Sequence, residues 1–360
     1  MNTFRILAIN PGSTSTKIAI YDNESMIFGT SISHNSQQIS NFTSVSDQFA
    51  FRRQEILEAI KKAGIELASI NTVVGRGGLL HPMTSGVYEV NELMLRDLKN
   101  SPIGQHASNL GGLIAHDIAQ SLHNVKAYIA DPVVVDELQE VARLTGIKGV
   151  ERHSIFHALN QKAVAREWAK EHGTQYDKSN LIVAHMGGGI SVGAHRCGEV
   201  VDVNNALDGE GPYTPERAGS MPCCNVVEMC MSGTYSRAEL YQLLCGRGGL
   251  VSLLGTNQVI KALEMAKSDP WAKLVMDGMV YNIAKNIGQM AVVLCGKVDA
   301  IILTGGIAHS RKITDEISSM VDFIAPVVVY PGEDEMKALA QNALRVINGE
   351  TQVKQYLGAQ

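Results

Sequence analysis

The stretch FRILAINPGSTSTKIAIYD, residues 4–22, decides the fold. Its two apolar runs, 4–10 and 14–22, flank the turn PGS at 11–13. We expect both runs to be buried strands, and a further strand at 26–33 to complete a meander. Because the turn joins strands of opposite direction, it is a hairpin and not the strand-to-helix turn of a Walker loop.

The same pattern returns in the second half of the chain. A buried strand is expected at 181–184, and it runs into the glycine turn HMGGG at 185–189. Two more strands are expected at 190–196 and 199–203. A strand, a glycine turn and two further strands in each half indicate a duplicated α/β domain.

The remaining elements follow from apolar periodicity and from helix-ending residues. Short strands are expected near 72–75, 125–130, 299–303 and 323–330. We expect helices from a cap at Ser46 or Asp47 to Gly64, at 154–172, at 270–294 after the capping residue Asp269, and up to residue 348.

Composition excludes several classes of function. The chain has 360 residues, enough for two domains, and a net charge of -5, which leaves no basic surplus for nucleic acid or an anionic membrane. No apolar run approaches the ~18–20 residues of a membrane span. The start of the chain lacks the features of a signal peptide, and the six cysteines form no CxxC pair. We therefore expect a cytoplasmic protein with reduced, partly buried thiols.

Three glycine-rich turns suit a nucleotide. The first, at 10–17, has a tight turn at Gly12, four hydroxyl side chains and Lys17, a set that suits phosphate oxygens. The second, at 185–191, lets the backbone approach a ligand closely. The third, at 303–307, ends a buried strand in two glycines that could admit a flat base. Each turn alone is also consistent with a plain hairpin or a packing turn.

Taken in order, these turns resemble the acetate and butyrate kinase family, within the sugar kinase, Hsp70 and actin superfamily. INPGSTSTK (9–17) resembles the family's first phosphate loop, HMGGGIS (185–191) the second, and LTGGIAHS (303–310) the adenosine loop. The likeness runs from residue 6 to about residue 345. Three features point to the butyrate branch, and they are Pro11, Gly188 in place of an asparagine of acetate kinases, and Ala308-His309-Ser310.

The resemblance implies two ribonuclease H-like domains around a nucleotide cleft. Residues 1–154 with about 331–360 would form the domain of the acyl substrate and the first phosphate loop. Residues 155–330 would form the nucleotide-binding domain. A homodimer is also implied, to which the methionine-rich segment 276–290 could add apolar surface, although core packing is the commoner fate of such a stripe.

The resemblance also implies roles for individual residues. Arg76 would meet the substrate carboxylate and the transferring phosphoryl group, Asp131 matches the catalytic aspartate, and His157 matches a histidine that stabilises the transition state. Arg217, soon after Thr214-Pro215, is the best candidate for a second essential arginine. The residues expected at the nucleotide are Ser13, Lys17, His185, Gly187, Gly188, Gly189, Asn257, Gly305 and Gly306. Asn10 would hold Mg²⁺ together with Asp334 or Glu335, and the sequence leaves that choice open.

Plainer explanations exist for several of these residues. His157 follows Phe156 in the helix expected at 154–172, where a histidine is commonly a core residue. Asp131 could simply end a strand. The acidic run 333–335 could be favourable charge at a helix N-terminus.

The implied reaction converts butyrate, or a similar short fatty acid, and ATP reversibly into an acyl phosphate and ADP. A carboxylate is already a nucleophile, so the main obstacle is bringing two anions together, and Mg²⁺, arginine, histidine and backbone donors would neutralise the charge. A sugar or glycerol kinase, with Asp131 as base, is one rival. A non-catalytic nucleotide switch like Hsp70 is another, but two domains leave no room for a peptide-binding module.

Overall fold

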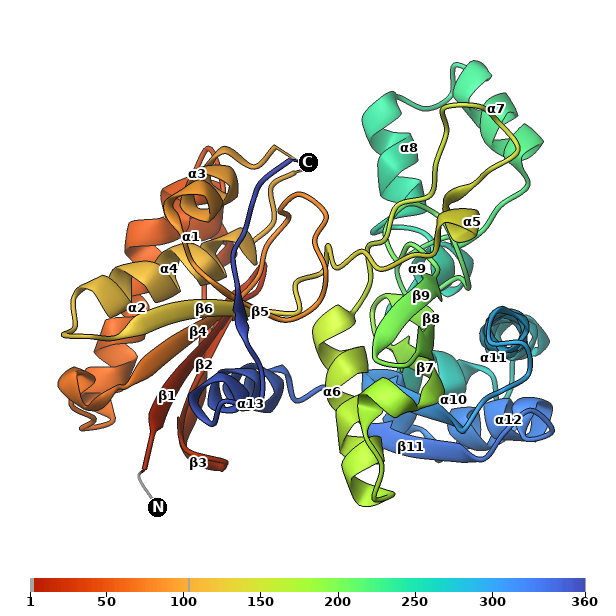
Figure 1. The fold of residues 1–360 in the computed structure, drawn as a ribbon. Helices are drawn as coiled ribbons and strands as arrows, with labels where there is room; N and C mark the ends of the chain where they lie inside the picture. Colours follow the sequence, from red (N-terminus) through yellow and green to blue (C-terminus); the bar gives the residue numbers. More distant parts are fainter. Residues whose placement is uncertain (1–2, 103, 360) are drawn as a thin grey trace. The chain divides into compact units, whose positions relative to one another are not determined.

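The computed structural model describes residues 3–102 and 104–359, which form two compact units (Figure 1). Unit 1 contains the chain up to Val135 and again from Asp334 onward, and unit 2 is Asp136–Glu333. The functional division expected at residues 154 and 330 stays a prediction. No helix among the described residues is both long and apolar enough to span a membrane.

Unit 1 is built on a seven-stranded sheet of order β12-β5-β6-β4-β1-β2-β3. β1, β2 and β3 form an antiparallel meander, which β4 extends as the parallel neighbour of β1 and β6 as the parallel neighbour of β4. The meander is the one that the opening stretch predicts. The strands are β1 (Arg5–Pro11), β2 (Ser15–Asp22), β3 (Ser25–Ser33), β4 (Thr72–Arg76), β5 (Val87–Glu89), β6 (Lys126–Ala130) and β12 (Val353–Lys354).

Unit 2 repeats this arrangement in a five-stranded sheet of order β11-β10-β7-β8-β9. The meander β7-β8-β9 is again extended by two parallel strands, β10 and β11. The order therefore matches β6-β4-β1-β2-β3 of unit 1 strand for strand, which confirms the predicted duplication. The strands are β7 (Asn180–Met186), β8 (Ile190–Arg196), β9 (Glu199–Val203), β10 (Ala300–Gly305) and β11 (Val327–Pro331).

Helices cover the sheets of both units. Unit 1 has α1 (Ser36–Ser40), α2 (Phe49–Lys62), α3 (Glu92–Asn100), α4 (Asn109–Gln120) and α13 (Glu335–Ile347). Unit 2 has α5 (Glu140–Arg143), α6 (Ala158–Glu171), α7 (Cys223–Met231), α8 (Arg237–Leu244), α9 (Gly249–Leu254), α10 (Val259–Met265), α11 (Pro270–Val293) and α12 (Arg311–Val321). Short 3₁₀ turns are η1 (Ser46–Gln48), η2 (Leu67–Ser69), η3 (Tyr176–Lys178) and η4 (Gly306–His309).

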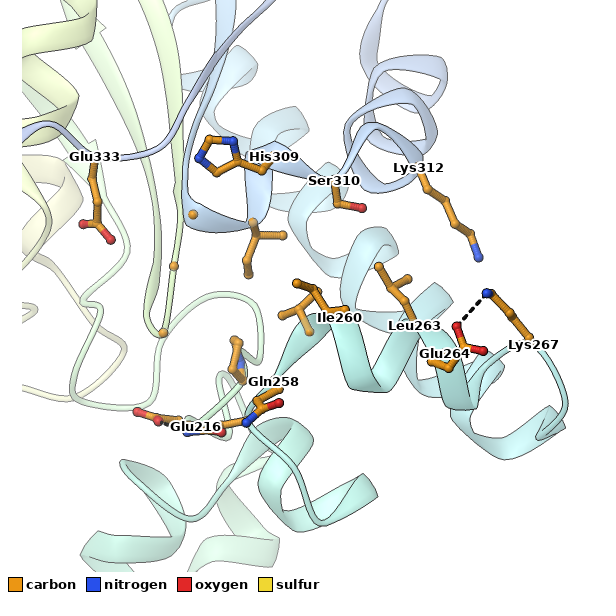
Figure 2. Close-up of a pocket in the computed structure, with 17 residues that line it drawn as sticks. Glu216, Gln258, Ile260, Leu263, Glu264, Lys267, His309, Ser310, Lys312 and Glu333 are labelled. Carbon is orange, nitrogen blue, oxygen red and sulfur yellow. Dashed lines mark hydrogen bonds and ion pairs between the residues drawn. The ribbon is translucent and has the colours of Figure 1, made fainter.

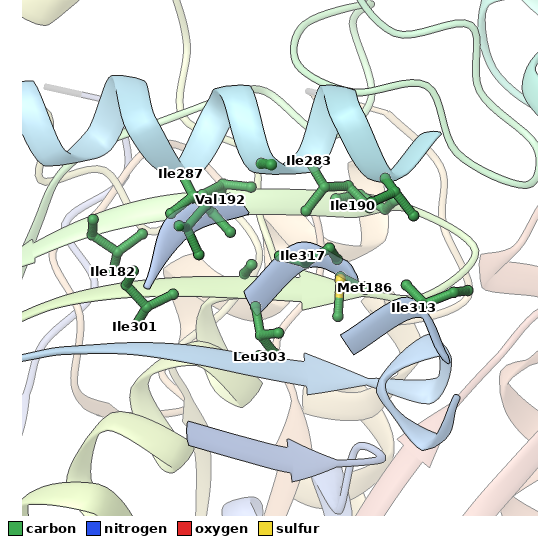
Figure 3. Close-up of a cluster of buried hydrophobic side chains, with 14 of the residues drawn as sticks. Ile182, Met186, Ile190, Val192, Ile283, Ile287, Ile301, Leu303, Ile313 and Ile317 are labelled. Carbon is green, nitrogen blue, oxygen red and sulfur yellow. The ribbon is translucent and has the colours of Figure 1, made fainter. Parts of the chain in front are cut away.

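Unit 2 has apolar cores that join its sheet to helices, one with α11 and α12 and a smaller one with α6. Figure 3 shows Ile283 and Ile287 of α11 above Ile190 and Val192 of β8. The helix begins as predicted, because the Asp269 carboxylate accepts the backbone N–H of the second helical residue at 2.9 Å. Its methionines 276, 279 and 290 are buried in this core, so the stripe stabilises unit 2 itself.

Three sequence-based predictions are wrong in detail. The helix expected at 154–172 begins only at Ala158, because His157 has non-helical dihedral angles, φ -81 and ψ 59, at the cap position. The strand expected at 323–330 begins at Val327, after a turn in which Phe323 is exposed. Five of the six cysteines are exposed rather than partly buried, and only Cys245 is intermediate.

Candidate active site

Three predicted residues of unit 1 lie at one edge of its sheet. β1, β4 and β6 are parallel neighbours, so their carboxyl ends meet at the same edge. Asn10 lies near the end of β1, Arg76 is the last residue of β4, and Asp131 follows β6 directly. The carboxyl edge of parallel strands is the usual place for a ligand in α/β sheets. A Cβ at Gly75 would collide with the backbone of Gly111, so glycine lets α4 approach β4 closely just before Arg76.

The Arg76 guanidinium lies against Glu335 at the start of α13. Its Nη1 is 2.9 Å from Oε1 and 3.1 Å from Oε2 of that carboxylate, and it donates to Asn10 Oδ1 at 3.3 Å. Asn10 Nδ2 in turn donates to Glu335 Oε2. The Asn10 side chain is buried, and the side chains of Arg76 and Glu335 are 22% and 13% exposed. The structure thus brings together three of the predicted residues.

The two candidate acids for Mg²⁺ have different surroundings. The Asp334 carboxylate caps α13 by accepting the backbone N–H of Lys337 at 2.9 Å. Glu335 instead faces the amide of Asn10. Among the described residues, no cluster of three or more His, Cys, Asp or Glu side chains could hold a metal. Mg²⁺ is commonly bound by one or two carboxylates together with waters and substrate phosphates, so oxygens of Glu335 and Asn10 fit that ion.

Asp131 is held in an unusual backbone conformation. Its φ is 38°, in the left-handed region that non-glycine residues rarely adopt. The side chain is buried, and its Oδ1 accepts the backbone N–H of Gly86 at 2.8 Å. A buried carboxylate fixed in this way at a strand end is a structural feature that functional sites often show.

The turn of the first glycine hairpin is held by Arg52, a residue that the sequence motifs did not point to. Arg52 is fully buried on α2, and it donates to the carbonyls of Gly12 at 2.7 Å, Ser13 at 3.2 Å and Ser15 at 3.1 Å. A trans peptide points its C=O and the following N–H in opposite directions. The N–H groups of Ser13 and Thr14 therefore point away from Arg52, toward the side where a phosphate could bind.

The hairpin also carries the two residues predicted to meet phosphates in unit 1. Ser13 and Lys17 are both exposed. The signal for Arg52 was present in the sequence, because it stands four residues before Ile56 and eight before Ile60 on the apolar face of α2. A charged residue in line with a buried stripe indicates a buried polar contact.

In unit 2, the second glycine turn lies beside two stacked histidines. The rings of His157 and His185 have centroids 3.8 Å apart and an interplanar angle of 12°. His185 Nδ1 is 2.7 Å from Asn160 Oδ1, and its Nε2 is 3.7 Å from Glu333. The structure thus places His157 against the turn at 185–191.

Arg217 lies against the same turn. Thr214 Oγ1 donates to the carbonyl of Gly188 at 2.7 Å and accepts the N–H of Arg217 at 3.0 Å. These two bonds hold the segment 214–217 against the glycine turn. Arg217 Nη1 donates to the Ala206 carbonyl at 2.5 Å. A Cβ at Gly189 would collide with the guanidinium, so this glycine makes room for the arginine.

A cavity of about 850 Å³ opens next to this turn (Figure 2). Of the predicted nucleotide-binding residues, Gly187, Gly188, Asn257 and Gly306 line it. Asn257 Nδ2 donates to Glu216 at 2.7 Å. The cavity size is typical of small-molecule sites, which measure ~300–1,000 Å³.

The apolar wall of the cavity comes from α10, which the sequence analysis did not identify. Val259, Ile260 and Leu263 line it together with Ile307 of η4. Farther along α10, Figure 2 shows Lys267 paired with Glu264 at 2.6 Å. Gly305, unlike Gly306, does not line the cavity. Its φ is 88°, and a Cβ there would collide with the backbone of Met186, so this glycine permits close packing of β10 on β7.

Comparison with known proteins identifies relatives of this arrangement. The model of the Acetokinase family matches residues 138–328, more than half of the chain. The crystal structure of Porphyromonas gingivalis acetate kinase superimposes with a TM-score of 0.77 at 18% identity, covering 96% of this chain and 100% of that one. A propionate kinase from Francisella tularensis gives a TM-score of 0.72 at 20% identity, covering 94% and 98%.

The likeness extends more weakly to sugar kinases. A candidate N-acetylmannosamine kinase from Listeria monocytogenes gives a TM-score of 0.50 at 15% identity, covering 97% of this chain and 100% of that one. These identities show the fold alone. They confirm the predicted fold class, a mixed α/β fold of the actin, Hsp70 and sugar kinase type with two sheets.

Proposed function

The chain belongs to the acetokinase family, and on this premise we propose that it transfers the γ-phosphoryl group of ATP to the carboxylate of butyrate or a close relative. The products are an acyl phosphate and ADP, and the reaction runs in either direction. The observation that carries the proposal is the Arg76 guanidinium, which Asn10 and Glu335 hold at the carboxyl edge of three parallel strands.

Arg76 is suited to a carboxylate. Nη1 makes the contacts to Glu335 and Asn10, which leaves the Nη2 side of the guanidinium to offer parallel N–H bonds to a substrate. Two parallel bonds orient a carboxylate in a way that lysine cannot copy. Asp131, fixed beside this arginine at the same edge, is the proposed catalytic carboxylate.

Glu335 and Asn10 are the proposed Mg²⁺ ligands of unit 1. Mg²⁺ bound there would neutralise charge on the phosphate oxygens. Ser13 and Lys17 of the first hairpin would contact phosphates, with the backbone N–H groups that Arg52 orients. Asp334 serves as the helix cap and is not proposed as a ligand.

The residues of unit 2 are proposed to bind ATP. The apolar wall of the cavity suits a purine, and Asn257 lies where it could reach a ribose. The glycines at 187–189 and Gly306 would bring backbone N–H groups close to the nucleotide. His157 and Arg217, both packed on that glycine turn, would donate to the oxygens of the transferring phosphoryl group, where negative charge must be neutralised.

The preference for butyrate is supported by Pro11, Gly188 and the segment 308–310, the features of the butyrate branch. The test is the initial rate of the purified full chain with ATP, Mg²⁺ and fatty acids of two to six carbons, with hydroxylamine to trap an acyl phosphate as a hydroxamate. One methylene is worth ~1–3 kcal/mol in a fitted pocket, or about 10–200-fold in kcat/KM. We expect kcat/KM for butyrate to exceed that for acetate by at least about tenfold.

Two outcomes of this assay would overturn the proposal. Acetate as the best substrate would reject the butyrate assignment but keep the family. ADP formation with a sugar and no hydroxamate from any acid would favour the rival hydroxyl kinase, in which Asp131 acts as base.

We also propose that the protein is a cytoplasmic homodimer that needs Mg²⁺, on the strength of the family resemblance. Light scattering at micromolar concentration measures the assembly directly. A monomer mass would reject the dimer without affecting the proposed reaction.

A further inference from the structure

A line of hydrogen bonds runs inward from His157. Its Nδ1 is 2.8 Å from Ser191 Oγ, which is 2.8 Å from Gln161 Nε2. Gln161 Oε1 is 3.0 Å from His195 Nε2, and His195 Nδ1 is 2.8 Å from the Tyr176 hydroxyl. Gln161, Ser191 and His195 are wholly buried, and all five residues belong to unit 2. We call this line the relay.

The direction of the relay is fixed by one backbone carbonyl. Gln161 Nε2 lies 3.0 Å from the carbonyl oxygen of Ser191, which can only accept. The amide nitrogen of Gln161 therefore faces Ser191, and its Oε1 faces His195. Because Oε1 can only accept, His195 carries its proton on Nε2.

The far end of the relay agrees with this direction. Burial lowers the pKa of His195 to about 3, so the ring is neutral at physiological pH. With its proton on Nε2, the ring uses Nδ1 as an acceptor, and the Tyr176 hydroxyl donates to it. Space for the amide comes from Gly193, where a Cβ would lie 2.6 Å from Gln161 Oε1.

The near end decides the tautomer of His157. The Ser191 hydroxyl accepts from Gln161 Nε2 and, at 3.4 Å, from the backbone N–H of His157. Its own proton is then directed to Nδ1 of His157. A proton on Nδ1 would place two donors against each other, because the Ser191 hydroxyl already donates there. The His157 ring therefore carries its proton on Nε2.

We propose that Ser191, Gln161 and His195 are positioning residues that hold His157 as a neutral imidazole protonated on Nε2. This inference rests on the proposed function, in which His157 donates to the transferring phosphoryl group. A fixed tautomer presents a donor at Nε2 without any reorganisation during the reaction.

The simpler explanation is that the relay only satisfies buried polar groups, as any core must. That explanation gives His157 the same tautomer, but it assigns the Ser191 hydrogen bond no part in turnover. The spectra therefore test whether His157 carries its proton on Nε2, and the kinetics of Ser191→Ala test whether the relay positions the ring for the reaction.

The test uses the full chain labelled with nitrogen-15 histidine and two-bond proton–nitrogen correlation spectra near pH 7.5, with His157→Asn to assign the ring. We expect Nδ1 of His157 to be unprotonated and hydrogen-bonded, and Nε2 to be protonated. In Ser191→Ala, the Nδ1 resonance should move downfield because its donor is lost. Ser179→Ala is the matched control, since that buried hydroxyl donates to the Gln175 carbonyl and lies outside the relay. A protonated Nδ1 in the parent would overturn the proposal.

Kinetics supply the second readout. A lost neutral hydrogen bond typically changes a rate by about 2–10-fold. We expect Ser191→Ala to lower kcat by about that factor, with the KM for ATP nearly unchanged and Ser179→Ala close to the parent. Parental kcat in a folded Ser191→Ala protein would show that the relay has no positioning role. If the parent makes no acyl phosphate, the proposed function fails, while the spectra still report on the relay.

Discussion

Replacing Arg76 by alanine tests the carboxylate site. The substitution removes the ion pair with Glu335, at 2.9 and 3.1 Å, and the contact with Asn10 at 3.3 Å. It leaves the Glu335 carboxylate with the amide of Asn10 as a donor. On our account, the enzyme then loses both the orientation of the substrate and a positive charge in the transition state.

Two magnitudes follow from these contacts. Hydrogen bonds to charged groups contribute ~1.5–3 kcal/mol, and both side chains of the pair are less than a third exposed, so we expect a stability loss of about that size. Loss of a charged donor at a reacting centre costs ~2.7–4 kcal/mol of transition-state stabilisation, or about 10²–10³ in kcat. The KM for ATP should change little, because Arg76 is assigned to the acyl side.

Arg5→Ala is the matched control. Arg5 stands at the other end of β1 and makes a bidentate pair with Asp22 at 2.8 Å, with side chains 28% and 24% exposed. Its removal should cost a similar amount of stability and leave turnover near the parent. The assay is steady-state kinetics with butyrate and ATP varied independently, beside urea unfolding of each variant. Near-parental turnover in a folded Arg76→Ala protein would refute the reasoning, and Arg76→Lys should stay well below the parent.

Three further substitutions test other parts of the site. Glu335→Gln should raise the Mg²⁺ concentration that gives half the maximal rate severalfold. Asp334→Asn should not, because an asparagine still caps the helix. Identical Mg²⁺ titrations of the two variants would reject Glu335 as a Mg²⁺ ligand. Gly189→Ala should lower kcat at least tenfold, since its Cβ would collide with the Arg217 guanidinium and displace it. Gly288→Ala on α11, where a Cβ meets nothing within 4 Å, should leave kcat near the parent, and the reverse order would contradict the geometry. Burial lowers the pKa of His195 to about 3 in the folded protein, whereas the unfolded chain keeps a value of ~6.5. Between these two pH values the unfolded state binds one more proton than the folded state. The free energy of unfolding should therefore fall as pH drops below about 6.5, by up to ~1.4 kcal/mol per pH unit. Urea unfolding at several pH values measures this dependence, and it should be weaker in His195→Gln than in the parent. Equal dependence of the unfolding free energy on pH in both proteins would contradict the prediction.

The fold could be predicted largely because each half opens with the same strand, turn and strand pattern. Prediction failed where apolar residues are buried without being helical. Phe156 continues an apolar stripe and is buried, but it lies in the irregular segment before α6, because periodicity cannot distinguish a buried loop from the first turn of a helix. The start of β11 was missed for the opposite reason, because Phe323 is apolar but exposed in the turn before the strand.

The positions of Asn10, Arg76 and Asp131 were predictable, because each ends or follows a short apolar strand. The roles proposed for them rest on the family resemblance and stay predictions. The roles of Asp334 and Glu335 could not be separated, because that choice depends on which carboxylate caps α13. The place of Arg52 in the buried stripe of α2 indicated a buried polar contact, but its partners, the carbonyls of the hairpin, could not be read from the sequence. The relay was missed because it joins neutral side chains of separate elements, which leave no motif.

The central claim is that the carboxylate oxygen of a fatty acid attacks the γ-phosphorus of ATP. The most direct measurement uses butyrate with oxygen-18 in both carboxylate positions, ATP and Mg²⁺, with hydroxylamine added to cleave the acyl phosphate at its carbonyl carbon. Attack by the carboxylate leaves its oxygen in the bridge to phosphorus, so the phosphate released by hydroxylamine should carry one oxygen-18 atom by mass spectrometry. Phosphate without the label, formed while ATP is consumed, would contradict the account.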